Sequence, residues 1–123
     1  MKIILQYKVG IDSERIVDTA KNGIEAIDII KKDIEYNNGK NSSYHLILMD
    51  CQMPLMDGYE STLKIRELLF SKGINQPIIS AVTGHTEESY MKRCYDSGMN
   101  QVVSKPVSAR LLKDLLEQLG YLS

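Results

Sequence analysis

A carboxylate, a hydroxyl and an ammonium group each follow a short apolar stretch of this sequence. Asp50 comes after the apolar residues 46–49, Thr83 ends the stretch 77–83, and Lys105 follows the segment 101–104. A carboxylate can act as a nucleophile and form an acyl phosphate. Phosphoryl transfer also needs neutralisation of the charge on the transferred group, to which an ammonium and a hydroxyl donor contribute. The candidate chemistry is therefore phosphoryl transfer to Asp50, with Mg²⁺ as the cation normally held by carboxylates and phosphate oxygens.

Along the sequence, short apolar runs typical of strands alternate with longer segments whose apolar residues recur at helical spacing. This pattern predicts strands alternating with helices. Such alternation is typical of an α/β fold with a parallel sheet, whose ligands bind outside the carboxyl ends of the strands. We therefore expect the three residues to meet at one edge of a sheet. The pattern predicts strands at 14–19, 45–49, 77–82 and 101–104, and helices at 23–35, 59–72, 86–97 and 108–120.

Composition excludes several classes of protein. The 123 residues predict one domain, 1–123, and the formal net charge is 15 − 16 = −1, so nothing favours nucleic acid or an anionic membrane as partner. The apolar runs are too short to span a bilayer, and the first residues lack the pattern of a signal peptide. We expect a cytoplasmic chain without membrane contact, in which Cys51 and Cys94 are reduced, small buried side chains.

The loop after Asp50 carries residues that restrict the backbone. Pro54 limits its conformation, and Asp57 with Gly58 forms a turn dipeptide before the next helix. This loop is expected to hold a backbone carbonyl near Asp50.

Four blocks of the sequence resemble the receiver domains of response regulators. Their residues are most similar to those of the receivers attached to hybrid sensor histidine kinases. The resemblance covers about residues 1–119, and the blocks occur in the family's order. They read LILMDCQMPLMDG at 46–58, PIISAVT at 77–83, GMN and SKP within 98–106, and AKNGIEA at 20–26.

The resemblance implies a flavodoxin-like open parallel sheet in the order 2-1-3-4-5, with helices on both faces. It implies a phosphohistidine donor, on a histidine kinase or a histidine phosphotransfer protein, and Asp50 as phosphoacceptor. Thr83 would then turn toward the acyl phosphate and Lys105 would pair with it. The Gln52 carbonyl and Asp50 would bind Mg²⁺. The remaining residues of the expected site loops are Met53, Pro54, Gly58 and Pro106.

One departure from the family concerns the acidic pair that follows its first strand and holds Mg²⁺. No adjacent acidic pair precedes Asp50; the candidates for its place are Asp12, Glu14 and Asp18, and none follows an apolar strand. We therefore predict that the first strand is missing and that residues 2–9 are the remainder of the first helix. In the alternative, residues 2–5 are the first strand, paired antiparallel with 14–17, because a parallel crossover needs a dozen or more residues.

These departures leave two hypotheses for the function. The chain is a phosphoacceptor that lacks a segment, or it is a pseudo-receiver that docks partners without chemistry through 86–97, 101–104 and the last helix. Val102 also stands where receivers often carry an aromatic switch residue. An aspartate-nucleophile phosphatase is disfavoured, because it needs a second carboxylate as general acid and Asp57 lies seven positions on in a turn. We therefore expect a signalling receiver rather than an enzyme.

Overall fold

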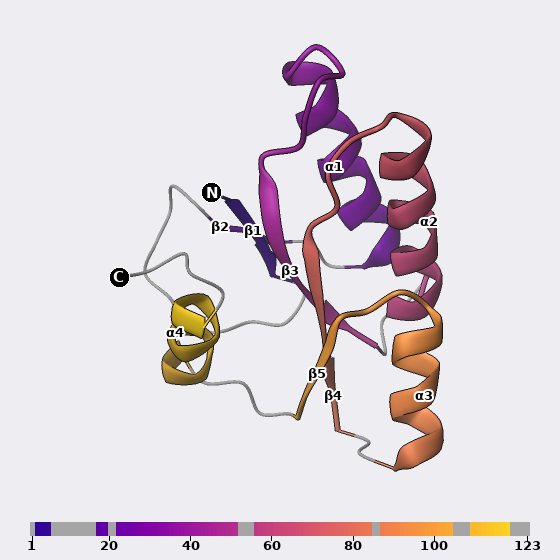
Figure 1. The fold of residues 1–123 in the computed structure, drawn as a ribbon, viewed down its shortest axis with the longest axis vertical. Helices are drawn as coiled ribbons and strands as arrows, with labels where there is room; N and C mark the ends of the chain where they lie inside the picture. The colour runs from indigo at the N-terminus through magenta and orange to yellow at the C-terminus, as the bar shows by residue number, and fades with distance from the viewer. Residues whose placement is uncertain are drawn as a thin grey trace.

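A five-stranded parallel sheet forms the centre of the computed structural model (Figure 1). The structure describes residues 2–5, 17–19, 22–51, 56–84, 87–104 and 109–118. The strand order is β2-β1-β3-β4-β5, which confirms the open parallel α/β fold expected of a receiver. The strands are β1 (Lys2–Leu5), β2 (Val17–Thr19), β3 (Tyr44–Asp50), β4 (Ile78–Thr83) and β5 (Gln101–Ser104).

Four helices cover the sheet in the part of the chain that the structure describes. They are α1 (Gly23–Tyr36), α2 (Gly58–Ser71), α3 (Glu88–Asp96) and α4 (Ala109–Gln118). Figure 1 shows α1, α2 and α3 side by side on one face of the sheet and α4 on the other. The predicted helices are thus confirmed, with ends that differ by a few residues.

The prediction of a missing first strand is wrong. Residues Lys2–Leu5 form β1 in the middle of the sheet, where Ile3 pairs with Val17 of β2 and with Leu46 of β3. Both pairings are parallel, so the antiparallel alternative is also wrong, and residues 2–5 are not helical. The physical reason is that β1 bonds to strands on both sides and removes the exposed edge that β3 would otherwise have. The connecting residues 6–16 lie outside the described part of the chain, including positions 6–9 and 14–16 of the predicted helix and strand.

The two strands that end in Asp50 and Thr83 are deeply buried. Residues Leu46, Ile47, Leu48 and Met49 of β3 are at most 1% exposed, and β4 is buried from Ile79 onward. Helices on both faces explain why these strands are apolar throughout rather than alternating. Burying each large apolar side chain contributes about 1.5–3 kcal/mol, so the end of β3 is held firmly.

The beginnings of α1 and α2 are joined at the carboxyl edge of the sheet. The Gly23 amide donates to the Met56 carbonyl at 3.3 Å, and the Ser61 hydroxyl donates to the Gly23 carbonyl at 3.2 Å. A Cβ on Gly23 would lie 2.8 Å from the Met56 carbonyl oxygen, so a glycine is required for this close approach. The start of α2, which follows the candidate site loop, is thereby fixed against α1.

Candidate functional site

Asp50 and Thr83 lie at the same edge of the sheet, on neighbouring strands. Asp50 is the last residue of β3 and pairs with Val82, while Thr83 is the last residue of β4 and pairs with Ser104. Asp50 is partly exposed and Thr83 is 3% exposed. Since adjacent strands lie about 4.8 Å apart, the carboxylate and the hydroxyl belong to one small region.

Several predicted site residues fall outside the described part of the chain. Lys105 is one of them; in the sequence it follows Ser104, the last residue of β5. The structure brings together Asp50 and Thr83 of the three expected residues, and the position and role of Lys105 stay predictions. The other predicted site residues outside the described part of the chain are Gln52, Met53, Pro54 and Pro106.

The backbone on either side of the loop after Asp50 is anchored. The Cys51 amide donates to the Val82 carbonyl at 3.2 Å, and the Gly58 amide donates to the Cys51 carbonyl at 3.4 Å. A Cβ on Gly58 would overlap the backbone oxygen of Asp50 and lie 2.9 Å from Met49 Cγ. The first residue of α2 thus packs directly on the end of β3, which explains the glycine at position 58.

Asp57 serves the helix rather than the reacting group. Its carboxylate caps α2 by accepting a hydrogen bond from the Glu60 amide at 2.9 Å. Arg93 Nη2 of α3 lies 3.8 Å from the Asp57 carboxylate, and the Arg93 guanidinium lies 4.0 Å from the centre of the Tyr59 ring. These contacts join α3 to the start of α2, next to the candidate site. Nothing in the spacing of Tyr59 and Arg93 along the sequence signals this contact.

The two cysteines are buried as expected, and they also touch each other. Cys51 Sγ and Cys94 Sγ are 3.7 Å apart. Burial, together with the neighbouring Cys94 thiol, raises the pKa of Cys51 to about 12. Burial and then the two thiols raise the pKa of Tyr59 as well. The Cys51 thiol and the Tyr59 phenol are therefore protonated at neutral pH.

The described strand ends offer a divalent cation only one carboxylate. The last residues of the five strands are Leu5, Thr19, Asp50, Thr83 and Ser104. No cluster of three or more His, Cys, Asp or Glu side chains that could hold a metal occurs among the described residues. Gln6 and Tyr7 follow β1 in the sequence, and both are neutral. Within the described residues, the donor set is therefore poorer than Mg²⁺ normally requires before a phosphate is bound.

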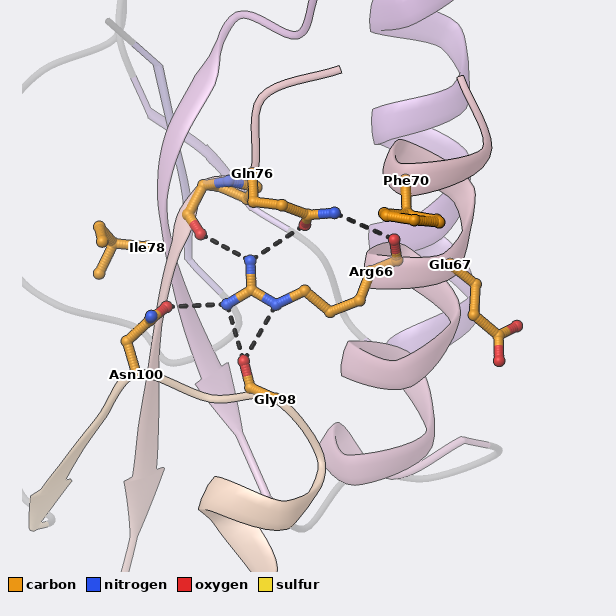
Figure 2. Close-up of a pocket in the computed structure, with 8 residues that line it drawn as sticks. Arg66, Glu67, Phe70, Gln76, Ile78, Gly98 and Asn100 are labelled. Carbon is orange, nitrogen blue, oxygen red and sulfur yellow. Dashed lines mark hydrogen bonds between the residues drawn. The ribbon is translucent and has the colours of Figure 1, made fainter. Parts of the chain in front are cut away.

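A pocket at the opposite edge of the sheet is lined by a hydrogen-bonded arginine (Figure 2). Arg66 of α2 donates from Nε and Nη2 to the Gly98 carbonyl at 3.0 and 2.7 Å, and from Nη2 to Asn100 Oδ1 at 2.8 Å. Its Nη1 donates to Gln76 Oε1 at 3.0 Å and to the Pro77 carbonyl at 2.8 Å. Partial burial lowers the pKa of Arg66. The five N–H groups are thus all used to tie α2 to the segments before β4 and β5.

Replacing Arg66 with lysine is expected to lower the free energy of unfolding by about 2–3 kcal/mol, because an ammonium group has no planar fork and leaves carbonyls unpaired. Urea unfolding followed by circular dichroism measures the change. The matched control is Arg93→Lys, whose exposed ion pair should make it cost at most about 1 kcal/mol. Equal losses in the two variants would contradict the role given to Arg66.

The amino-acid sequence of this chain is similar to those of known proteins. The family model of the response regulator receiver domain matches residues 3–117. The chain belongs to this receiver family. Hybrid signal transduction histidine kinase B of Dictyostelium discoideum is 39% identical over 116 residues, which is 88% of this chain and 5% of that protein. The osmosensing histidine protein kinase SLN1 of Saccharomyces cerevisiae is 34% identical over 115 residues, which is 94% of this chain and 9% of that protein.

Solved receiver structures agree with the fold. The receiver domain of Ssk1 from Saccharomyces cerevisiae, crystallised with the histidine phosphotransfer protein Ypd1, is 26% identical with a TM-score of 0.74, covering 97% of this chain and 88% of that one. The receiver domain of the histidine kinase CKI1 from Arabidopsis thaliana, complexed with Mg²⁺ and BeF3⁻, is 25% identical with a TM-score of 0.72, covering 98% of this chain and 91% of that one. Mg²⁺ binding is therefore found among receivers of this kind.

This receiver spans less than a tenth of the length of the histidine kinases given above. None of the helices in the described ranges combines the length and the apolar character needed to cross a membrane.

Proposed function

We propose that this receiver accepts a phosphoryl group from a phosphohistidine onto Asp50 within a two-component phosphorelay. The observation that carries the proposal is the position of Asp50 at the end of β3, beside Thr83 at the end of β4. The phosphohistidine belongs to a histidine kinase or a histidine phosphotransfer protein. The structural similarity to the Ssk1 receiver, crystallised with Ypd1, supports a donor of the second kind.

The proposed step is a displacement at phosphorus. A carboxylate oxygen of Asp50 attacks the phosphorus, the phosphorus–nitrogen bond breaks, and the imidazole leaves with the electron pair of that bond. The Thr83 hydroxyl donates a hydrogen bond to a phosphoryl oxygen, and the Lys105 ammonium neutralises its charge. The backbone bonds of Cys51 hold the carboxylate in place while the bond forms.

The experiment that tests this function is intact-mass measurement after incubation with a phosphorylated histidine phosphotransfer protein, with acetyl phosphate as a second donor. Gain of one phosphoryl group that is released by hydroxylamine, as an acyl phosphate is, supports the proposal. A folded chain that gains no mass from either donor would overturn it.

A docking module without chemistry is the second candidate. It is favoured by the single carboxylate among the last residues of the described strands. Its surface would lie at the β5 edge of the sheet, where α3 and α4 flank the strand on opposite faces (Figure 1). Tyr95 of α3 is 50% exposed and Leu111 of α4 is 39% exposed. A folded chain that binds a phosphotransfer protein without gaining a phosphoryl group would favour this candidate.

Mg²⁺ affinity is expected to be weak, and to rise when a carboxylate is restored after β1. The Gln6→Asp variant places an acid directly after a strand that neighbours β3. One added charge near the cation contributes about 1–4 kcal/mol, so we expect at least about a fivefold increase in affinity. Isothermal titration calorimetry with MgCl₂ measures it. The control Asn75→Asp adds the same charge before β4, at the other edge, and should change the affinity by less than about twofold. Tight binding by the unchanged chain would contradict the prediction.

A further inference from the structure

Two buried thiols lie in contact next to the candidate phosphoacceptor and have no part in the proposed phosphoryl transfer. Cys51 follows Asp50 directly and is 1% exposed, and Cys94 in α3 is fully buried. Their sulfur atoms are 3.7 Å apart, although 43 positions separate the two residues in the sequence. They are the two cysteines of the chain, so an oxidised Cys51 has Cys94 as its nearest thiol partner.

The two sides of this contact differ in how firmly they are held. The backbone of Cys51 is bonded on both sides, to the Val82 carbonyl and to the Gly58 amide. The helix that carries Cys94 is nine residues long, and Cys94 is its one buried residue. Helices with few buried side chains open locally at a lower free-energy cost than core strands. Movement that brings the sulfur atoms together is therefore expected in α3 rather than in β3.

A disulfide needs only a small approach from this geometry. The sulfur atoms are 3.7 Å apart and a disulfide bond is about 2.0 Å long, so the distance must shorten by about 1.7 Å. A shift of this size lies within what a short, mostly exposed helix can supply. The exposed ion pair of Arg93 with Asp57 is weak enough to adjust with it.

We propose that Cys51 and Cys94 form a modification site, which a small hydroperoxide converts into an intramolecular disulfide. The Cys51 or Cys94 sulfur attacks the peroxide oxygen, which gives a sulfenic acid and releases one water molecule in the case of hydrogen peroxide. The second thiol then attacks the sulfenic sulfur, the sulfur–sulfur bond forms, and a second water molecule leaves. The two thiols are thereby oxidised by two electrons in total, and the peroxide is reduced to two molecules of water.

The burial of the site makes the first step slow and the second step fast. Buried thiols in apolar surroundings react poorly with oxidants, so the peroxide must reach them when α3 opens. Once one sulfur is oxidised, the other thiol is already in contact with it. The product ties the residue after Asp50 to α3 by a covalent bond, independently of whether Asp50 accepts a phosphoryl group.

The test is oxidation of the folded 123-residue chain with hydrogen peroxide, followed by unfolding, alkylation of free thiols and mass spectrometry. We expect the number of alkylated cysteines to fall from two to none. A linked peptide pair containing Cys51 and Cys94 should appear and should be separated by a thiol reductant. The control Cys94→Ser keeps the size of the side chain and should give no linked peptide.

Three outcomes would overturn the proposal. One is oxygen addition at the cysteines without the linked pair. Another is linkage between two chains only. The third is a folded chain that keeps both thiols while the same chain in urea is oxidised by the same peroxide. Because these readouts do not involve phosphoryl transfer, failure here is distinct from failure of the proposed function.

Discussion

Replacing Asp50 with asparagine is expected to abolish the gain of a phosphoryl group. The amide of asparagine has nearly the shape of the carboxylate but is no nucleophile toward phosphorus. Loss of an enzyme's nucleophile has reduced rates by about a millionfold, so we expect uptake to fall at least about a thousandfold, below detection. Intact mass after incubation with acetyl phosphate or a phosphorylated phosphotransfer protein measures the result. Thermal unfolding of the variant shows whether the fold is retained.

The matched control is Asp57→Asn, which removes the same charge seven positions further along. Asparagine caps helices about as well as aspartate, so the bond to the Glu60 amide and the start of α2 should be kept. The ion pair with Arg93 is long and exposed, and its loss should cost little. Uptake by Asp57→Asn should stay within about a factor of three of the unchanged chain. Persistent uptake by Asp50→Asn would place the acceptor on another residue.

The strands that carry the site could be predicted from the sequence because burial on both faces makes them apolar throughout. The run before Asp50 and the run before Thr83 became β3 and β4 within one or two residues of the predicted ends. The order of strands and helices then followed from the alternating spacing of apolar residues along the sequence. The position of Asp50 and Thr83 at one edge followed from the parallel pairing of the strands. Local signals sufficed here because each of these strands is long and apolar.

The first strand could not be predicted, because its evidence is not local. Four residues, Lys2–Leu5, fit a helical face as well as a strand, and the short spacing to β2 argued against parallel pairing. These four residues form a strand because they pair with β2 on one side and β3 on the other, and this pairing exists only in the assembled sheet. The contacts of Arg66, of Cys51 with Cys94, and of Arg93 with Tyr59 have the same origin. Each joins residues that are distant in the sequence and brought together by the crossovers of the sheet.

Replacing Gly58 with alanine is expected to lower the free energy of unfolding by about 3 kcal/mol, although alanine favours a helix more than glycine does. The added Cβ would overlap the backbone oxygen of Asp50 and lie 3.0 Å from Cys51 Cα, so the peptide unit that joins Asp50 to Cys51 would have to move. Relief requires α2 to shift away from the end of β3, against its contacts with α1 and the sheet. The shift would also displace the Asp50 backbone, so phosphoryl uptake should fall together with stability. Urea unfolding gives the first quantity and intact mass gives the second.

Gly84→Ala is the matched control for this prediction, because Gly84 also lies at the carboxyl edge, one residue after β4. No atom lies within 4 Å of a Cβ built on Gly84, and its backbone is outside the left-handed region. The same chemical change should therefore alter the free energy of unfolding by less than about 1 kcal/mol, in the stabilising direction through the lower entropy of the unfolded chain. If Gly58→Ala proved as mild as Gly84→Ala, the close approach of α2 to the end of β3 would not be what positions Asp50. In that case the hydrogen bonds of Cys51 to Val82 and Gly58 would have to fix the carboxylate alone.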